Sequence, residues 1–297
     1  MQNYILSFCN EISFPEDAIQ DLLKNYIELQ AKEDCFGRFN ELVEFYKKNS
    51  SKDKQEGIFS ELDDIAKLSG IHNYSLHMLY LIALSIHTRK LYEEKNISYE
   101  IYLDSMTDLR AKLMECNELH GVWGTSVAWW EIDLFNLTLI ALGRLQYEFI
   151  PFQGEYTSGK HSLKNGDRVL NVHIPSLGPL LYDDCKASFQ KAANFFRDDF
   201  GEKPVAFVCH SWLLYPEHRV FLPPNSNILK FMSFFDIISS EVSEDKEDLW
   251  RVFYKDWEKE PIDLPRNTSI QRAYADWLIK GNKIGMGYGV LLYEDKI

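Results

Sequence analysis

The stretch Val169-Leu-Asn-Val-His-Ile174 decides how the second half of this chain folds. From Leu170 onward its apolar and polar side chains alternate, and Arg144-Leu-Gln-Tyr-Glu-Phe149 alternates in the same way. Because successive side chains of a strand point to opposite faces, both segments predict β-strands. The polar, glycine-containing residues 153–167 between them have the length of a hairpin connection.

Four polar residues fall on one face of these two predicted strands. They are Gln146 and Glu148 on the first strand and Asn171 and His173 on the second. A buried polar group costs about 1–3 kcal/mol unless it is hydrogen-bonded, so four such groups inside a covered sheet predict a functional site. The alternative is an antiparallel hairpin whose polar face is simply exposed to solvent.

The rest of the second half alternates between strands and helices. Apolar runs predict further strands at 205–209, 249–254 and 289–293, and helical spacing predicts helices at 185–200, 226–239 and 269–280. Strands and helices in this order predict one mixed sheet with helices on its faces. Alternate glycines at 285, 287 and 289 predict tight turns or a close approach of backbone to the last strand.

The first 142 residues show a different, helical pattern. Apolar residues recur at helical spacing after Pro15, and residues 75–94 form a strong helix with a nearly continuous apolar surface. A further helix is expected to run from Thr125 or Ser126 through Leu142. The fold class is therefore α+β, with an all-helical domain over 1–142 followed by a mixed-sheet α/β domain over 143–297.

Composition excludes several classes of protein. The chain has 297 residues and a net charge of −13, so a nucleic-acid backbone or an anionic membrane surface would repel it. No signal peptide or membrane-spanning stretch is evident, and the five cysteines have no zinc-binding or disulfide spacing. We expect a cytoplasmic protein without a metal site, and the sequence does not indicate its oligomeric state.

The segment Pro175-Ser-Leu-Gly-Pro179 connects a predicted strand to a predicted helix. Free N–H groups at the start of a helix bind phosphate or pyrophosphate. However, the single Gly178 is a weak signal, and Asp183 and Asp184 would oppose an anion in the first helical turn. Taken alone, this loop is more often structural than functional.

Several segments together resemble a small group of two-domain bacterial acyltransferases with a helical N-acyltransferase N-terminal domain and a GNAT-like C-terminal domain. The likeness would span essentially the whole chain. It is carried by the segments Gly-Arg-Leu-Gln-Tyr-Glu-Phe (143–149), Leu-Asn-Val-His-Ile-Pro-Ser-Leu-Gly-Pro-Leu (170–180), Cys-His-Ser-Trp-Leu-Leu-Tyr-Pro (209–216), Leu-Pro-Pro-Asn-Ser-Asn-Ile-Leu (222–229) and Leu-Pro-Arg-Asn-Thr-Ser-Ile-Gln-Arg (264–272).

This resemblance implies transfer of an acyl group from acyl-CoA or acetyl-CoA to an amine of a small molecule or peptide. In such enzymes a central strand binds the thioester and pantetheine arm, and the loop after it receives the pyrophosphate. Here the strand corresponds to 169–174 and the loop to 176–180. The implied CoA-binding residues are Ile174, Ser176, Leu177, Gly178, Leu180 and, on the late helix, Asn227.

Acyl transfer also needs groups that move protons. Glu148 and His173 are the candidate bases for the amine, because strand parity places both on the polar face. Many members of the superfamily protonate the leaving thiolate with a tyrosine, but Phe234 stands at that position in this chain. The resemblance therefore leaves Tyr215, Ser211 or water as the proton donor.

Two other functions compete with this interpretation. Phe234 and the single-glycine loop favour a non-catalytic module that binds a ligand or partner on a GNAT-like scaffold. Cys209-His210 could belong to a thiol hydrolase, but adjacent residues of a strand point to opposite faces, which favours a buried structural cysteine.

Overall fold

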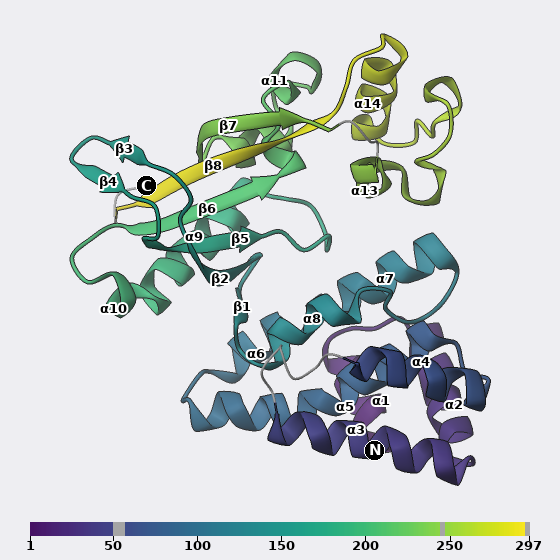
Figure 1. The fold of residues 1–297 in the computed structure, drawn as a ribbon. Coiled ribbons are helices and arrows are strands. Elements are labelled where there is room, and N and C mark those ends of the chain that lie inside the picture. Colours follow the sequence, from purple (N-terminus) through teal and green to yellow (C-terminus); the bar gives the residue numbers. More distant parts are fainter. Residues whose placement is uncertain (50–56, 244–246, 295–297) are drawn as a thin grey trace. The chain divides into compact units, whose positions relative to one another are not determined.

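The computed structural model describes residues 1–49, 57–243 and 247–294. The chain forms two compact units, Met1–Ala141 and Leu142–Ile297 (Figure 1). None of the helices in the described residues is both long and apolar enough to cross a membrane.

The first unit is helical, as predicted. Its helices are α1 (Gln2–Glu11), α2 (Glu16–Gln30), α3 (Glu33–Lys48), α4 (Ile58–Ser69), α5 (Asn73–Glu94), α6 (Tyr99–Met106), α7 (Asp108–His120) and α8 (Ala128–Phe135). The central helix α5 is buried along most of its length, including every residue from Ser75 to Ser85. A helix that is apolar on all sides belongs in the core, and the other helices pack around it.

A buried cluster of charged side chains lies between α7 and α8. Glu131 is fully buried; one of its carboxyl oxygens accepts a hydrogen bond from Thr125 at 2.5 Å, and the other has no hydrogen-bond partner among the described residues. Lys112 forms an ion pair with Glu115 at 3.1 Å, and Asp108 is also buried. Burial, and then the nearby charge of Asp108, raises the pKa of Glu131 to about 8.

This raised pKa predicts how the stability of the chain depends on pH. Between about pH 4.5 and 8 the folded protein holds a proton on Glu131 that the unfolded chain has released, so the unfolding free energy falls as pH rises. The slope reaches about 1.4 kcal/mol per pH unit. We expect Glu131→Gln to remove this slope, making the variant more stable than the wild type at pH 8.

Denaturant unfolding at pH 5 and pH 8 measures this effect. The matched control is Glu118→Gln, on the exposed side of α7, which should retain the pH dependence of the wild type. Equal pH slopes for Glu131→Gln and the wild type would show that this carboxyl group is not protonated in the folded state.

Residues 139–297 contain a six-stranded mixed sheet, also as predicted. The strand order is β1-β2-β5-β6-β8-β7, and β3 and β4 form a separate two-stranded sheet (Figure 1). The strands β5 and β6 are parallel, and the recorded pairs β2–β5, β6–β8 and β7–β8 are antiparallel. The strands are β1 (Leu139–Leu142), β2 (Leu145–Pro151), β3 (Tyr156–Ser158), β4 (His161–Leu163), β5 (Arg168–His173), β6 (Val205–Ser211), β7 (Asp236–Val242) and β8 (Gly285–Tyr293).

One face of this sheet is covered by α9. The Phe189 ring of α9 lies 6.3 Å from the Tyr147 ring of β2 and 5.2 Å from the Phe207 ring of β6. The stripe of apolar residues that the sequence predicted for this helix therefore forms its packing surface. The helices of this unit are α9 (Tyr182–Phe195), α10 (Arg197–Phe200), α11 (His218–Phe221), α12 (Asn227–Met232), α13 (Trp250–Phe253) and α14 (Ser269–Ile279).

The opposite face has an apolar half and a polar half. Phe152, Val169 and Val208 form a small core there, against which residues of the β3–β4 hairpin pack. This core lies toward the amino-terminal ends of β5 and β6. The polar residues predicted from the alternation of β2 and β5 lie beyond it, toward the carboxyl end of β5.

The predicted helix running to Leu142 is wrong in its second part. The helix α8 ends at Phe135, Leu137 has a left-handed φ of 63°, and residues 139–142 form β1. The side chain of Asn136 accepts a hydrogen bond from the N–H of Thr138, which stabilises the turn. A short apolar run is compatible with a helix or a buried strand, and here sheet pairing decides.

Two further predictions near the end of the chain are wrong. Residues 249–254, predicted as a strand, lie in short helical segments that include α13. The helix predicted over 226–239 ends at Met232, and β7 follows from Asp236. This strand is mostly exposed at the edge of the sheet, so its polar residues carry no alternating pattern that would reveal it.

Candidate active site

A hydrogen-bonded group of polar side chains lies on the sheet face opposite α9. Nε2 of His173 lies 2.7 Å from Oε1 of Glu148, and Nδ2 of Asn171 donates to the same oxygen at 3.0 Å. The imidazole and carboxylate side chains are 26% and 25% exposed. The group is therefore ordered by the protein but open to a bound molecule.

Strand pairing brings these residues together. In the antiparallel register of β2 and β5, Glu148 is opposite Asn171 and Gln146 is opposite His173. The side chains that were expected to share one face are therefore in direct contact across the two strands. Gln146 is buried, and its side-chain nitrogen has no hydrogen-bond acceptor among the described residues, so it remains a donor for a bound molecule.

The geometry determines how the imidazole can work. An ionised Glu148 only accepts hydrogen bonds, so the tautomer that suits this contact carries its proton on Nε2 and its lone pair on Nδ1; Nδ2 of Asn171 also lies 3.1 Å from Nε2. A carboxylate in this position orients the ring and stabilises the imidazolium that forms when the ring takes up a proton. Glu148 and His173 thus form a carboxylate–imidazole pair suited to general-base chemistry.

Next to this pair, β5 and β6 separate. Leu170 pairs with Phe207 and Asn171 pairs with Val208. Beyond these pairs β5 continues to His173 and β6 to Ser211. The main chain at 172–174 therefore has no strand partner on the β6 side among the described residues. Ile174, predicted to contact the cofactor, directly follows β5 at this opening.

The predicted anion-binding loop connects β5 to α9. It contains the predicted residues Ser176, Leu177, Gly178 and Leu180, and Gly178 has a left-handed φ of 66° that favours glycine. The helix α9 has 14 residues, and no side chain caps its amino terminus. No capping side chain therefore accepts a hydrogen bond from the first N–H groups of this helix. Asp183 and Asp184 occupy its first turn.

Arg144, to which the sequence assigned no role, lies beside this loop. Its Nε donates a weak hydrogen bond to the carbonyl oxygen of Pro179 at 3.4 Å. Partial burial lowers the pKa of its guanidinium, an effect that an adjacent phosphate would offset. The antiparallel pairing of β2 with β5 places the start of β2 next to the end of β5, which alternation alone could not show.

The other predicted residues lie in different surroundings. The Ser211 hydroxyl accepts a hydrogen bond from the N–H of Leu213 and caps a short 3-10 helix (Trp212–Leu214). Tyr215 directly follows that helix and is buried. Asn227 is the first residue of α12, where Ser226 caps the helix. Their roles in binding or catalysis stay predictions.

The Cys209–His210 pair does not form a nucleophilic dyad. Cys209 is fully buried, and burial raises the pKa of its thiol to about 12. The neighbouring imidazole lies on the exposed side and contacts Glu241 at 3.2 Å. The structure therefore gives a cysteine hydrolase no reactive thiolate at this position.

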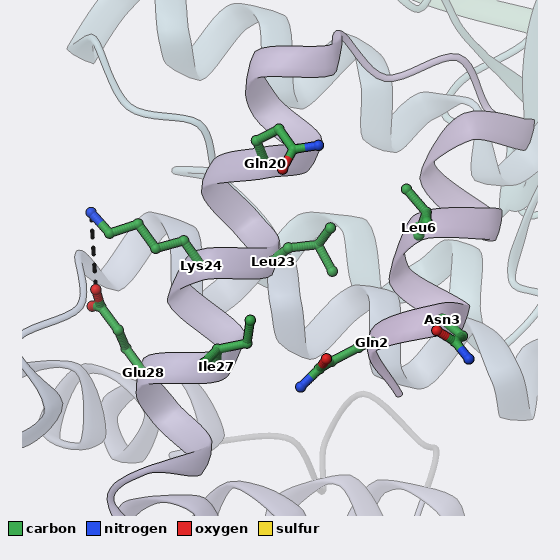
Figure 2. Close-up of a pocket in the computed structure, with 8 residues that line it drawn as sticks. All are labelled: Gln2, Asn3, Leu6, Gln20, Leu23, Lys24, Ile27 and Glu28. Atoms are coloured by element: carbon green, nitrogen blue, oxygen red, sulfur yellow. Dashed lines mark ion pairs between the residues drawn. The ribbon is translucent and has the colours of Figure 1, made fainter.

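A separate pocket of about 530 Å³ lies on the helical unit, between α1 and α2 (Figure 2). Lys24 and Glu28 form a 3.9 Å ion pair at its side, and Leu6 and Ile27 expose apolar surface. None of the residues predicted for catalysis lines it. The described residues also contain no group of three or more histidine, cysteine or acidic side chains arranged to hold a metal ion.

Solved structures with the same fold are acyltransferases. One is a crystal structure of an acyltransferase in complex with decanoyl-CoA and teicoplanin, with a TM-score of 0.73 and 20% identity. A second, in complex with decanoyl-CoA alone, has a TM-score of 0.73 and 19% identity. Each comparison covers 97% of this chain and 87% of the other chain. No curated protein matches this sequence.

Family models match both units. The N-acyltransferase N-terminal domain matches residues 4–137, and the GNAT-like C-terminal domain matches residues 139–291. The second match alone covers more than half of the chain and contains β2, β5 and the loop after β5. The chain therefore belongs to the family of acyltransferases that join an N-acyltransferase N-terminal domain to a GNAT-like C-terminal domain.

Proposed function

We propose that this protein transfers an acyl group from acyl-CoA to an amine. The observation that carries the proposal is the Glu148–His173 pair beside the opening between β5 and β6. The amine nitrogen attacks the thioester carbonyl carbon, and His173 takes the proton that this nitrogen loses as the C–N bond forms. Main-chain N–H groups near 172–174 would stabilise the negative charge that develops on the carbonyl oxygen.

The loop after β5 is proposed to bind the pyrophosphate of CoA. Gly178 and the start of α9 supply main-chain donors, and Arg144 supplies a positive charge beside Pro179. This arginine offsets the first-turn acids Asp183 and Asp184, which would otherwise repel the ligand. The absence of a glycine-rich loop is therefore compatible with phosphate binding.

The donor and acceptor are proposed only as chemical classes. Structures of similar fold hold decanoyl-CoA, and one also holds teicoplanin. A donor with a medium-length acyl chain and a small-molecule or peptide amine are accordingly the first compounds to test. The net charge of −13 agrees with a neutral or cationic acceptor.

Calorimetry with acetyl-CoA, octanoyl-CoA and decanoyl-CoA tests the binding half of this proposal. We expect saturable binding of at least one of them, competed by free CoA. No heat and no thermal shift at millimolar concentrations of all three would contradict the proposal.

A charge change at Arg144 tests the phosphate site. We expect Arg144→Gln to weaken acyl-CoA binding about tenfold, corresponding to about 1.4 kcal/mol, with little effect on kcat. The matched control Arg197→Gln, in α10, should leave the affinity unchanged. Unchanged affinity in Arg144→Gln would remove this arginine from the site.

The second candidate function is a non-catalytic module that binds CoA or a partner. Phe234 favours it, because phenylalanine cannot donate a proton to a leaving thiolate. Saturable acyl-CoA binding without transfer to an amino sugar, a lysine-containing peptide or teicoplanin would support this alternative.

A further inference from the structure

A tyrosine lies where the loop after β5 becomes α9. Tyr182 is the first residue of this helix, and its ring stacks on that of Phe234 with centroids 4.5 Å apart and 9° between the planes. The side chain is only partly buried. Its hydroxyl makes no hydrogen bond within the ranges of the chain that the structure describes.

Helix geometry places Tyr182 at the end of α9 that lies toward the opening between β5 and β6. Phe189, seven residues later on the same face of α9, packs on Tyr147 and Phe207 in the paired part of the sheet. Seven residues of helix span about 10 Å. A helix that connects two parallel strands runs antiparallel to them, so Tyr182 lies toward their carboxyl ends, where β5 and β6 separate.

Phe234 also fixes the position of the tyrosine ring. Its own ring lies 5.2 Å from the Phe189 ring and 6.3 Å from the Phe231 ring, so it belongs to the core between α9 and α12. One face of the Tyr182 ring therefore rests on ordered, buried residues. The hydroxyl is the polar tip of a side chain whose apolar body is held in place.

Other proton donors of this unit are less suited to a leaving group at the opening. The Ser211 hydroxyl accepts a main-chain hydrogen bond as a helix cap. His218 is fully buried, its Nε2 lies 2.6 Å from the Tyr274 hydroxyl, and burial lowers its pKa to about 4, so the ring is neutral near pH 7. Tyr182 differs from these two groups because its hydroxyl has no hydrogen-bond partner among the described residues and its side chain is only partly buried.

We infer that Tyr182 is a catalytic acid that protonates the CoA sulfur as it leaves. The inference rests on the proposed function. When the tetrahedral intermediate collapses, the C–S bond breaks and its electron pair goes to sulfur, which takes the phenolic proton. The products are the N-acylated amine and the CoA thiol, and the proton that the amine gave to His173 passes through solvent to the Tyr182 phenolate, which restores both groups.

The test compares Tyr182→Phe with the wild type, using decanoyl-CoA as donor and the amine that the wild type acylates fastest. We expect kcat to fall about 100-fold, because a general acid contributes 10²–10⁴-fold in rate. The Kd for decanoyl-CoA should change less than twofold, since the stacked ring is retained. Tyr254→Phe, an exposed change outside the site, is the matched control and should leave kcat unchanged.

Each remaining outcome contradicts a defined part of the inference. A kcat within twofold of the wild type would show that another group or water protonates the sulfur. Weaker decanoyl-CoA binding with unchanged kcat would make Tyr182 a binding residue only. A wild type that acylates none of the amines would instead contradict the proposed function, and the role of Tyr182 with it.

Discussion

His173→Ala lowers kcat for acyl transfer by about 10²–10⁴-fold and leaves the Kd for acyl-CoA unchanged. This is the expected result if the imidazole removes the proton from the attacking amine, because a general base contributes this much to the rate. In the wild type the Glu148 carboxylate lies 2.7 Å from Nε2 and orients the ring. Steady-state kinetics and calorimetry on the same preparation measure the two quantities.

A second histidine of the same unit provides the control. His161 on β4 contacts Glu294 at 2.7 Å, so His161→Ala also breaks a histidine–carboxylate contact but lies outside the polar group around His173. Its kcat should match the wild type. Undiminished turnover in His173→Ala would dismiss this residue as the base.

Gly287→Ala destabilises the chain by about 1–3 kcal/mol or more. A Cβ atom at this position of β8 would overlap the main-chain carbonyl group of Leu214, which cannot move as a flexible side chain could. Gly285 is enclosed in the same way by the main-chain oxygen of Glu241, whereas Gly289 is enclosed by the side chains of Phe235 and Leu214. The alternating glycines thus confirm the predicted close backbone approach. We expect the thermal midpoint to fall by several degrees.

The same substitution at a different glycine should change the stability of the chain in the opposite direction. Gly37 lies inside α3, and an added Cβ would have no neighbour within 4 Å. Gly37→Ala should therefore stabilise the chain by about 0.5–1 kcal/mol, because alanine loses less backbone entropy in a helix. A Gly287→Ala variant with the same thermal midpoint as the wild type would show that this region of β8 can shift without loss of stability.

The face of the sheet that carries the site could be predicted because alternation is a local property. In β2 and β5, period-two spacing alone assigns Glu148, Asn171 and His173 to one face, and the structure brings these three into contact. The same reasoning could not give the 2.7 Å contact itself. That depends on register, which is set by pairing over the whole strand.

Features that depend on tertiary contacts could not be predicted from these patterns. Arg144 meets Pro179 only because β2 runs antiparallel to β5. Tyr182 gains its position from stacking on Phe234, a residue 52 positions away in the sequence. The edge strand β7 and the short strand β1 were missed for the same reason, since neighbouring strands rather than side-chain patterns define them.

The most direct test of acyl transfer is a single-turnover reaction of the purified chain with decanoyl-CoA and an amine. Release of the CoA thiol is followed over time, and the second product is identified by mass spectrometry. We predict thiol release that depends on the amine, accompanied by an equal amount of N-acylated product. Saturated enzyme that releases thiol at the same rate with and without every amine, and forms no amide, would contradict the assignment.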